Sequence, residues 1–580
     1  MAGTTPDTKD TMTVHSPRRR RSAAALIASA VLALSGCGFI SSLSGDGDTD
    51  TTKPGTAPGI TDAKLDEPRS LDGASPIGPG TDGMAQLTGA SPVATDSDAL
   101  KLTVDPRTDG AYAKYYSQKI EWKGCEKPEW RQAQCATVTV PLQWSDPSKG
   151  DIDLQLTRRS VAESEKKGSI LINPGGPGGS GADTVGSYGD YIVTDTLRSS
   201  FDIVGFDPRG VADSHGIRCI GDDKMDAWMD GTYFSSDPDD VEGQAKEMKE
   251  AFDQCAQNSG DILPYMDTFS SARDMDVIRA ALGEDKLDYL GFSYGTFLGA
   301  TYAELFPDTT GHFVLDGALD PQLTGDEIAA GQARGFQASL EKFAKFCMDS
   351  GSECPLTGTP EEGAQQMMDW ASSLEDKPLK GPDGRSLTPN LARTTIISMM
   401  YNTQNWQPLQ NGLNQAMKNG DATTMMMLAD FATERNQDGT YKGNSTWSIN
   451  AVNCLDRQYV TDQKWMDEES ERLKKAYPAV GDQMAYTGAI CGSWPQKPVR
   501  QAATIDAEGA GPIVVIGTKN DPATPYEWSV SLNEQLADST LITYDGWGHT
   551  AYGSSGGCVE DAVDEFFLNG TKPQDGLTCS

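Results

Sequence analysis

The sequence predicts an α/β fold built on a mostly parallel sheet, with a helical cap domain inserted into it. Apolar strands alternate with helical segments over residues 111–322 and again over 501–580, which we assign to the two parts of the core. Residues 323–500 carry long helical patterns without that alternation. Several strands end in polar or glycine-rich turns, and such turns collect at the carboxyl edge of a parallel sheet, where ligands bind.

The composition is that of a large and strongly acidic chain. Its 580 residues suffice for a large core and for more than one domain. Asp and Glu number 84 against 48 Lys and Arg, which gives a net charge of −36. A surface of this sign repels phosphate groups, so we do not expect nucleic acid or other polyanions as partners.

The first 36 residues are predicted to be a signal peptide. Basic residues at 18–21 precede an apolar run over 23–34, which is too short to span a bilayer. The sequence LSGC at 34–37 resembles a bacterial lipobox. It implies cleavage before Cys37 and acylation of its thiol, which would tether the protein to the outer face of the cell membrane. Cleavage after the triplet at 28–30 is the alternative and would release a soluble protein.

Residues 37–110 are predicted to be a disordered tether. They are rich in Gly, Ser, Thr, Asp and Pro and show no sustained periodicity. Such a segment cannot bury enough apolar surface to fold, and it would hold the folded part away from the lipid.

Cysteine usage agrees with export. Ten of the eleven cysteines remain when Cys37 is set aside, and an even number suits disulfides in an oxidising compartment. No CxxC motif or Cys/His cluster has zinc spacing, so we expect no metal and no cofactor. The order of the cysteines suggests five local pairs: Cys125–Cys135, Cys219–Cys255, Cys347–Cys354, Cys454–Cys491 and Cys558–Cys579.

The first core block opens with two segments of alternating polarity, 135–144 and 151–161, which predict a strand hairpin. The next strand runs into the loop PGGPGG at 174–179. No Lys-Ser or Lys-Thr follows, so the loop does not match a phosphate cradle. Because glycines let backbone N–H groups approach a developing negative charge, we interpret it as an oxyanion loop with Gly176 as a donor.

The following strand, 201–206, leads into the turn DPRG at 207–210. A pairing of Asp207 with Arg209 would brace the loop beneath the site, and a plain surface turn is the alternative. A helical, acidic region over 241–260 and a further helix then lead into the next strand.

The stretch 287–307 predicts a strand, a sharp turn at Ser293 and a helix, in the pattern G-x-S-x-G. This is the context of a nucleophile elbow, where small neighbours are needed because the serine backbone is strained and its hydroxyl must stand clear of the sheet. The backbone N–H of Tyr294 is then the second oxyanion donor. An ordinary glycine-flanked turn is the alternative. A second match around Ser555 has neither strand nor helix beside it, and we interpret it as a loop.

The cap segment 323–500 contains helical patterns such as 390–402 and 421–436. Their Met and aromatic stripes are more often packed in a core than exposed to a ligand.

The second core block supplies an imidazole at the end of a strand. A serine hydroxyl is a poor nucleophile unless a base removes its proton, and imidazole suits that task near neutral pH. Of the four histidines, one lies in the leader, and His215 and His312 lack a suitable position. His549 follows a strand, has glycine neighbours and gives the chain order Ser, Asp, His of the α/β-hydrolase fold.

A carboxylate is needed to hold this imidazole in the right tautomer and to stabilise its cation. Asp521 follows the strand before the histidine strand and is our assignment, with Asp316 as the rival. With Ser293, Asp521 and His549 in these roles, the predicted reaction is acyl transfer through a seryl ester, followed by hydrolysis.

Taken together, these motifs resemble the secreted tripeptidyl aminopeptidases of actinobacteria, which belong with the prolyl aminopeptidase-like α/β-hydrolases. The resemblance runs from about Tyr112 to the end of the chain and rests on PGGPGG at 174–179, DPRG at 207–210, GFSYGTFLGATYAELFP at 291–307, VLDGALDP at 314–321, GTKNDPATP at 517–525, GWGHTAY at 546–552 and a paired Cys558 and Cys579.

The resemblance implies a serine exopeptidase that removes short peptides, typically tripeptides, from substrates with a free N-terminus. It implies that Asp456 is a cap carboxylate that receives the substrate's ammonium, with a surface ion pair to Arg457 or to another residue as the alternative. It also implies that Thr524 supports Asp521. Ala212 departs from the family, whose members usually carry glycine there, which puts the geometry of that loop in question.

Two other functions fit the same sequence. An esterase or lipase would share the catalytic groups and differ in the cap, which decides the acyl group. A non-catalytic lipoprotein that binds peptides is the third hypothesis, against which a complete set of catalytic side chains argues.

Overall fold

The structure is a computed structural model that describes residues 102–233 and 241–580. The predicted signal peptide, Cys37 and nearly all of the predicted tether 37–110 lie outside the described residues. Within the described ranges, no helix is both long and apolar enough to cross a membrane.

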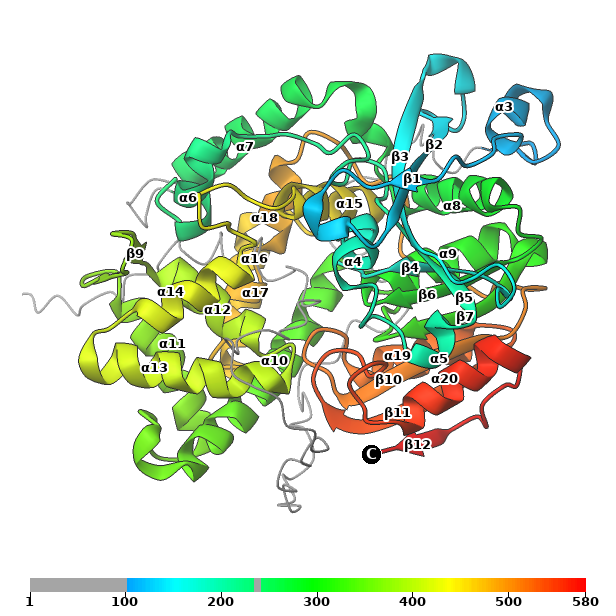
Figure 1. Cartoon of the computed structure of the whole chain (residues 1–580). Coiled ribbons are helices and arrows are strands. Elements are labelled where there is room, and N and C mark those ends of the chain that lie inside the picture. The colour runs from blue at the N-terminus through cyan, green and yellow to red at the C-terminus, as the bar shows by residue number, and fades with distance from the viewer. Residues whose placement is uncertain (1–101, 234–240) are drawn as a thin grey trace, which may run out of the picture.

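Within the described residues, the core is one ten-stranded sheet in the order β1-β2-β3-β5-β4-β6-β7-β10-β11-β12 (Figure 1). The first four strands in this order pair antiparallel and the others pair parallel, which confirms the hairpin and the mostly parallel sheet. The strands are β1 (Lys123–Gly124), β2 (Gln134–Pro141), β3 (Asp151–Arg159), β4 (Gly168–Asn173), β5 (Phe201–Phe206), β6 (Leu287–Phe292), β7 (Thr310–Asp316), β10 (Ile513–Asn520), β11 (Ser539–Trp547) and β12 (Leu577–Cys579).

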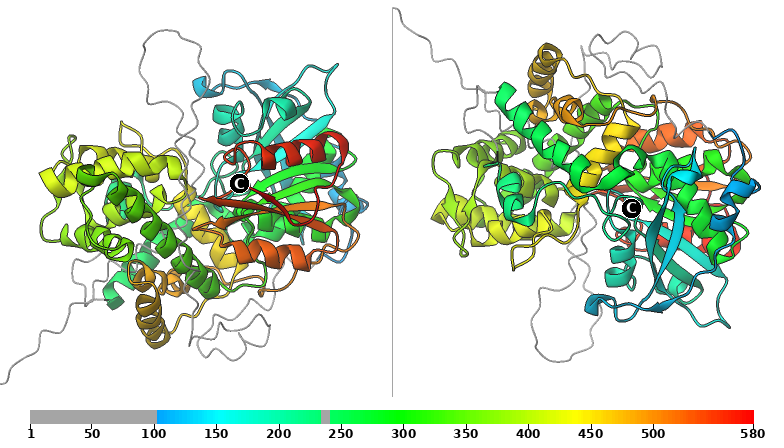
Figure 2. Two further views of the ribbon diagram at one scale, coloured as in Figure 1. Left: turned by 90° about the horizontal axis from the view of Figure 1, so that it is seen from below. Right: turned by 90° about the horizontal axis from the view of Figure 1, so that it is seen from above.

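Helices cover both faces of this sheet. One face packs against α8 (Thr268–Leu282), α9 (Tyr294–Leu305) and α19 (Tyr526–Gln535). The other packs against α4 (Gly181–Tyr188), α5 (Asp195–Arg198) and α20 (Cys558–Asn569). The view from below shows α19 and α20 on opposite sides of the strands (Figure 2). Because the central strands are buried on both faces, their sequences are mostly apolar and do not alternate with polar residues.

The helices of the cap form a lobe beside the sheet (Figure 1). Their ends follow local sequence signals: Thr324 and Thr359 form capping boxes, and Thr388 caps a helix that begins at Pro389. The helices are α10 (Gly325–Asp349), α11 (Pro360–Ser373), α12 (Pro389–Met399), α13 (Trp406–Asn419), α14 (Thr423–Ala432), α15 (Ser445–Asp456), α16 (Gln463–Ala476), α17 (Gly481–Met484) and α18 (Thr487–Ser493), with a small hairpin of β8 (Leu379–Lys380) and β9 (Ser386–Leu387).

The boundary predicted at residue 322 does not separate all cap-packing helices from the core. Helices α6 (Asp222–Asp230) and α7 (Val241–Asn258) fall in the segment assigned to the core, but they pack on the cap. The ring of Trp228 lies 4.7 Å from that of Trp447 in α15. The ring of Phe252 lies 4.9 Å from that of Trp494, which follows α18. The aromatic faces of these helices find their apolar partners in the cap, and this pairing could not be predicted from the local pattern.

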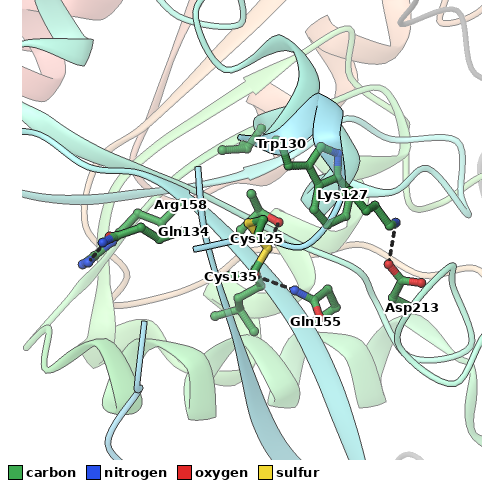
Figure 3. Close-up of a disulfide and its surroundings, with 12 residues drawn as sticks. Cys125, Lys127, Trp130, Gln134, Cys135, Gln155, Arg158 and Asp213 are labelled. Carbon is green, nitrogen blue, oxygen red and sulfur yellow. Dashed lines mark hydrogen bonds and ion pairs between the residues drawn. A yellow bond between two sulfur atoms is a disulfide. The ribbon is translucent and has the colours of Figure 1, made fainter. Parts of the chain in front are cut away.

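All five predicted disulfide pairs are confirmed. Figure 3 shows Cys125–Cys135, which joins β2 to the segment before it. In the same view Lys127 lies over the ring of Trp130, with 3.9 Å from its Nζ to the ring centroid, and binds Asp213 at 2.7 Å. The edge of the sheet is therefore fastened to the loop that follows β5.

Candidate active site

Ser293 lies at a strained turn between β6 and α9. Its φ of 55° and ψ of −122° are unusual for a residue with a side chain, and its N–H donates to the carbonyl oxygen of Asp316 at 2.9 Å. The flanking glycines are required, because a Cβ on Gly291 would lie 2.5 Å from the carbonyl oxygen of Gly295. A Cβ on Gly295 would lie 2.9 Å from the carbonyl oxygen of Asn173. The turn has the geometry of a nucleophile elbow.

His549 and Asp521 form a buried pair at the ends of β11 and β10. Nδ1 of the imidazole lies 2.9 Å from each carboxylate oxygen. The histidine side chain is 3% exposed and the aspartate side chain 0%. The carboxylate also accepts the N–H groups of Ala523 and Thr524 and the hydroxyl of Thr524, each at 2.9 Å. The aspartate therefore fixes the orientation of the ring and leaves Nε2 available to accept a proton.

The elbow and the imidazole meet at the carboxyl end of β7. Ser293 binds the carbonyl oxygen of Asp316, and a Cβ on the next residue, Gly317, would lie 3.2 Å from Cε1 of His549. Nε2 of His549 is buried and has no hydrogen-bond partner among the described residues. The Ser293 hydroxyl therefore does not donate to it in this conformation, as is common for catalytic hydrogen bonds in enzymes without substrate.

The rival carboxylate, Asp316, does not bind the imidazole. It is fully buried and accepts the N–H groups of Ala551 at 2.9 Å and Tyr552 at 2.8 Å, so it holds the loop that carries His549. Burial raises its pKa to about 7. His312 is also placed elsewhere: it lies in β7 with its Nδ1 3.0 Å from Asp288.

The glycine-rich loop lies against the elbow. A Cβ on Gly175 would lie 2.4 Å from the carbonyl oxygen of Phe292 and 2.9 Å from Cβ of Ser293, so only glycine allows this approach. Gly176 lines the same cavity as Ser293. Tyr294 is the first residue of α9, where backbone N–H groups lack acceptors within the helix. Both predicted donors are thus close to the serine, and their role in binding an oxyanion stays a prediction.

A cavity of about 90 Å³ lies between core and cap beside Ser293. The core lines it with Gly176, Pro177, Ser293, Leu319 and Thr524. The cap and the segment after α15 line it with Gly325, Ile328, Ala329, Gln332, Ile449, Asn450, Asn453, Cys454, Arg457, Tyr459, Met484, Thr487, Ile490 and Cys491. Arg457 is the one charged residue among these described lining residues.

The geometry does not favour Asp456 as the group that receives an ammonium. Its side chain is fully buried at the end of α15, it does not line the cavity, and burial raises its pKa to about 6. Its two oxygens accept the N–H of Thr268 at 3.0 Å and the hydroxyl of Thr268 at 2.5 Å. The alternative of a surface ion pair with Arg457 is wrong, because both side chains are buried.

The turn after β5 braces the site, but through partners other than those predicted. Arg209 is buried and binds Asp274 of α8 at 2.6 and 2.7 Å, so it does not pair with Asp207. Asp207 instead accepts the hydroxyl of Ser180 at 2.5 Å. Ala212 adopts a φ of 42°, which explains why a glycine would suit this position.

Comparison with known proteins places these observations in a family. A family model described as "TAP-like protein" matches residues 477–579. Serine protease Hip1 of Mycobacterium tuberculosis is 34% identical over 482 residues, which cover 80% of this chain and 91% of the relative. Carboxylesterase B of the same species is 35% identical over 470 residues, covering 79% and 89%. Tripeptidyl aminopeptidase of Streptomyces lividans is 30% identical over 472 residues, covering 80% and 86%.

Proposed function

We propose that this chain, which belongs to the TAP-like family of α/β-hydrolase serine peptidases, is an extracellular exopeptidase that releases short peptides, typically tripeptides, from free N-termini. The observation that carries the proposal is the buried His549–Asp521 pair, whose free Nε2 lies at the same strand end as the strained Ser293. A binding protein without catalysis would have no use for such an arrangement.

In the proposed reaction the Ser293 oxygen attacks the carbonyl carbon of the scissile peptide bond. Nε2 of His549 takes the hydroxyl proton, and Asp521 stabilises the imidazolium that results. The N–H groups of Gly176 and Tyr294 donate to the oxygen that becomes negative. When the C–N bond breaks, the imidazolium gives its proton to the leaving amine. A water molecule, deprotonated by His549, then hydrolyses the seryl ester.

The size of the cavity bears on how a peptide enters. A volume of about 90 Å³ is small, because most ligand pockets are larger than about 300 Å³. A tripeptide therefore takes up more than this volume, and the rest of it extends toward the side of the cavity that is open to solvent. The preference for a free N-terminus draws support from the Streptomyces relative. The described residues that line the cavity include no carboxylate that could pair with the ammonium of the substrate.

The proposed location rests on the chemistry of the cysteines and on the N-terminal sequence. Five disulfides are stable in an oxidising compartment. A lipid on Cys37 would then tether the enzyme to the outer face of the membrane. Incorporation of labelled fatty acid, followed by fractionation of wild type and Cys37→Ser, tests the anchor, because the variant should be found in the culture medium without lipid.

Product analysis tests the activity. The rates of hydrolysis of an unblocked tripeptidyl anilide, its N-acetylated form and a p-nitrophenyl ester are compared. A longer peptide is also digested, and its products are identified by mass spectrometry. We expect the free tripeptide to be released and the acetylated substrate to resist. Equal cleavage of free and acetylated peptide would contradict the exopeptidase assignment. The carboxylesterase relative favours an esterase as the second candidate, and turnover of the ester alone would support it.

A further inference from the structure

Arg457 is a buried cation on the wall of the cavity. It directly follows α15, is 4% exposed and lines the cavity together with Ser293. One of its terminal nitrogens, Nη1, donates to Oδ1 of Asn453 at 3.2 Å. The other, Nη2, is buried and has no hydrogen-bond partner among the described residues. A guanidinium buried in this way lacks an acceptor, and its geometry suits the two oxygens of a carboxylate.

The neighbouring charged groups do not supply that acceptor. The carboxylate oxygens of Asp456 accept hydrogen bonds from Thr268. Arg500 lies over the same ring of Phe297, with its guanidinium carbon 4.8 Å from the ring centroid against 5.0 Å for Arg457. However, Arg500 does not line the cavity, and it donates to the carbonyl oxygens of Pro321 and Gln501. Of the two guanidinium groups on this ring, Arg457 is the one that faces the cavity with an unused donor.

The position of Arg457 is tied to the elbow. The hydroxyl of Tyr294, the residue after Ser293, lies 2.5 Å from Oγ1 of Thr268. The hydroxyl of Thr268 in turn donates to the carboxylate of Asp456 at 2.5 Å. Asp456 immediately precedes Arg457, so this chain of hydrogen bonds holds the arginine at a fixed place relative to the serine. The guanidinium of Arg457 also lies over the ring of Phe297. A rigid cation near the nucleophile can discriminate between substrates.

We propose that Arg457 binds a carboxylate of the substrate and gives the enzyme a preference for peptides that place a carboxylate in this cavity. This inference rests on the proposed function and adds the substrate class. The carboxylate comes from one of two sources, an Asp or Glu side chain near the scissile bond or the C-terminal carboxylate of a short peptide. The shared chemistry is a bidentate, charge-assisted pair between carboxylate and guanidinium. Among the described residues that line the cavity, the one charged residue is this arginine, whereas the chain as a whole is strongly acidic.

The test uses matched substrates that differ in one group. Tripeptidyl anilides with Asp or Asn, and with Glu or Gln, are compared at each of the three positions, and short peptides are compared with a free or an amidated C-terminus. For the wild-type full-length protein we expect kcat/KM to be about tenfold or more higher for the acid than for the amide in one of these pairs. Ratios of one or below in every pair would overturn the proposal.

The variants assign the effect to the guanidinium. Arg457→Gln should reduce the acid-to-amide ratio to about one, and Arg457→Lys should keep part of it, because the charge remains but the bidentate geometry is lost. Arg385→Gln is the matched control: it removes a cap arginine paired with Asp383 and Asp430 outside the cavity lining, and it should keep the wild-type ratio. An unchanged ratio in Arg457→Gln would also overturn the proposal.

Two further measurements separate the possible failures. Thermal unfolding shows whether each variant folds, and the wild-type pairs remain decisive if Arg457→Gln does not. If no peptide of either kind is hydrolysed, the proposed function fails rather than the charge preference. In that case binding of the acidic and amide tripeptides to the wild type is compared by calorimetry, and equal or absent binding of the acidic peptide overturns the role of Arg457.

Discussion

The core and the cap contribute differently to the cavity between them. The core supplies the groups that we propose as catalytic, Ser293, His549 and Asp521, from the ends of three parallel strands. The cap and the segment after α15 supply most of the walls, including Asn453 and Arg457. The core carboxylate has all its partners before substrate arrives, whereas the guanidinium of Arg457 lacks one. This difference indicates that chemistry is built into the core and that substrate choice is left to the cap.

The largest effect should come from removing the nucleophile in the core. Ser293→Ala is expected to lower kcat by a factor on the order of 10⁴–10⁶ with every substrate, because attack on the carbonyl is lost. Kinetics with peptide and ester substrates measure this. Ser555→Ala is the matched control: this serine lies in the second G-x-S-x-G pattern and donates to Glu560, so activity should stay at the wild-type level. A loss of activity in the control would contradict the assignment.

The next effect separates two core carboxylates. Asp521→Asn should lower kcat by roughly 10³–10⁴, because the imidazole loses its anionic partner and its tautomer. Asp316→Asn should lower kcat by about tenfold or less and lower the unfolding temperature, because one acceptor of the loop N–H groups is lost. The reverse order of the two losses in kcat would make Asp316 the catalytic carboxylate.

Two disulfides test the comparison directly. Both cysteines of Cys454–Cys491 line the cavity, whereas Cys558–Cys579 joins α20 to the last strand of the core. Replacing either pair by alanine should cost about 2–4 kcal/mol of stability. Only the cap pair should also raise KM, by about tenfold, with little change in kcat. Equal kinetic changes in both double variants would show that core and cap do not divide the work in this way.

The smallest expected effect concerns pH and the cap helix α10. Burial raises the pKa of Asp326 to about 7, and one of its oxygens has no hydrogen-bond partner among the described residues. Because this folded pKa lies above the ordinary value, the stabilising contribution is fully present below about pH 4 and is lost as the pH rises toward 7. Asp326→Asn should therefore be more stable than wild type by ~1–3 kcal/mol at pH 8 and similar to it at pH 4. Urea unfolding at both values measures this, and an equal difference at both would contradict it.

Most of the core could be predicted from the sequence, for a physical reason. Its strands are buried on both faces, so they appear as apolar runs in the sequence. Ser293, Asp521 and His549 could be grouped because each follows such a strand, and the carboxyl ends of parallel strands lie at one edge of the sheet. The partners of Arg209 and the packing of α6 and α7 could not be predicted, since both depend on contacts between segments distant in the chain.

The residues that line the cavity could not be predicted from the sequence either, because the cavity is formed by segments that are distant in the chain. Helical periodicity indicates which residues of α15 are buried, but not whether they face the cavity or the core beneath it. The family resemblance implies a substrate-binding role for Asp456, but its carboxylate is buried and accepts hydrogen bonds from Thr268. Its neighbour Arg457 lines the cavity. Two consecutive residues at the end of this helix therefore have different surroundings: the acid is buried away from the cavity, and the cation lines it.

Covalent labelling tests most directly whether Ser293 is activated by the buried imidazole. A fluorophosphonate is added to the wild-type protein, to Ser293→Ala and to His549→Ala, and intact mass and peptide mapping follow the rate and the site of modification. We expect one adduct on Ser293 of the wild type, none on Ser293→Ala, and labelling of His549→Ala slower by a factor on the order of 10³ or more. An adduct on another residue, or an unchanged rate without His549, would contradict the account.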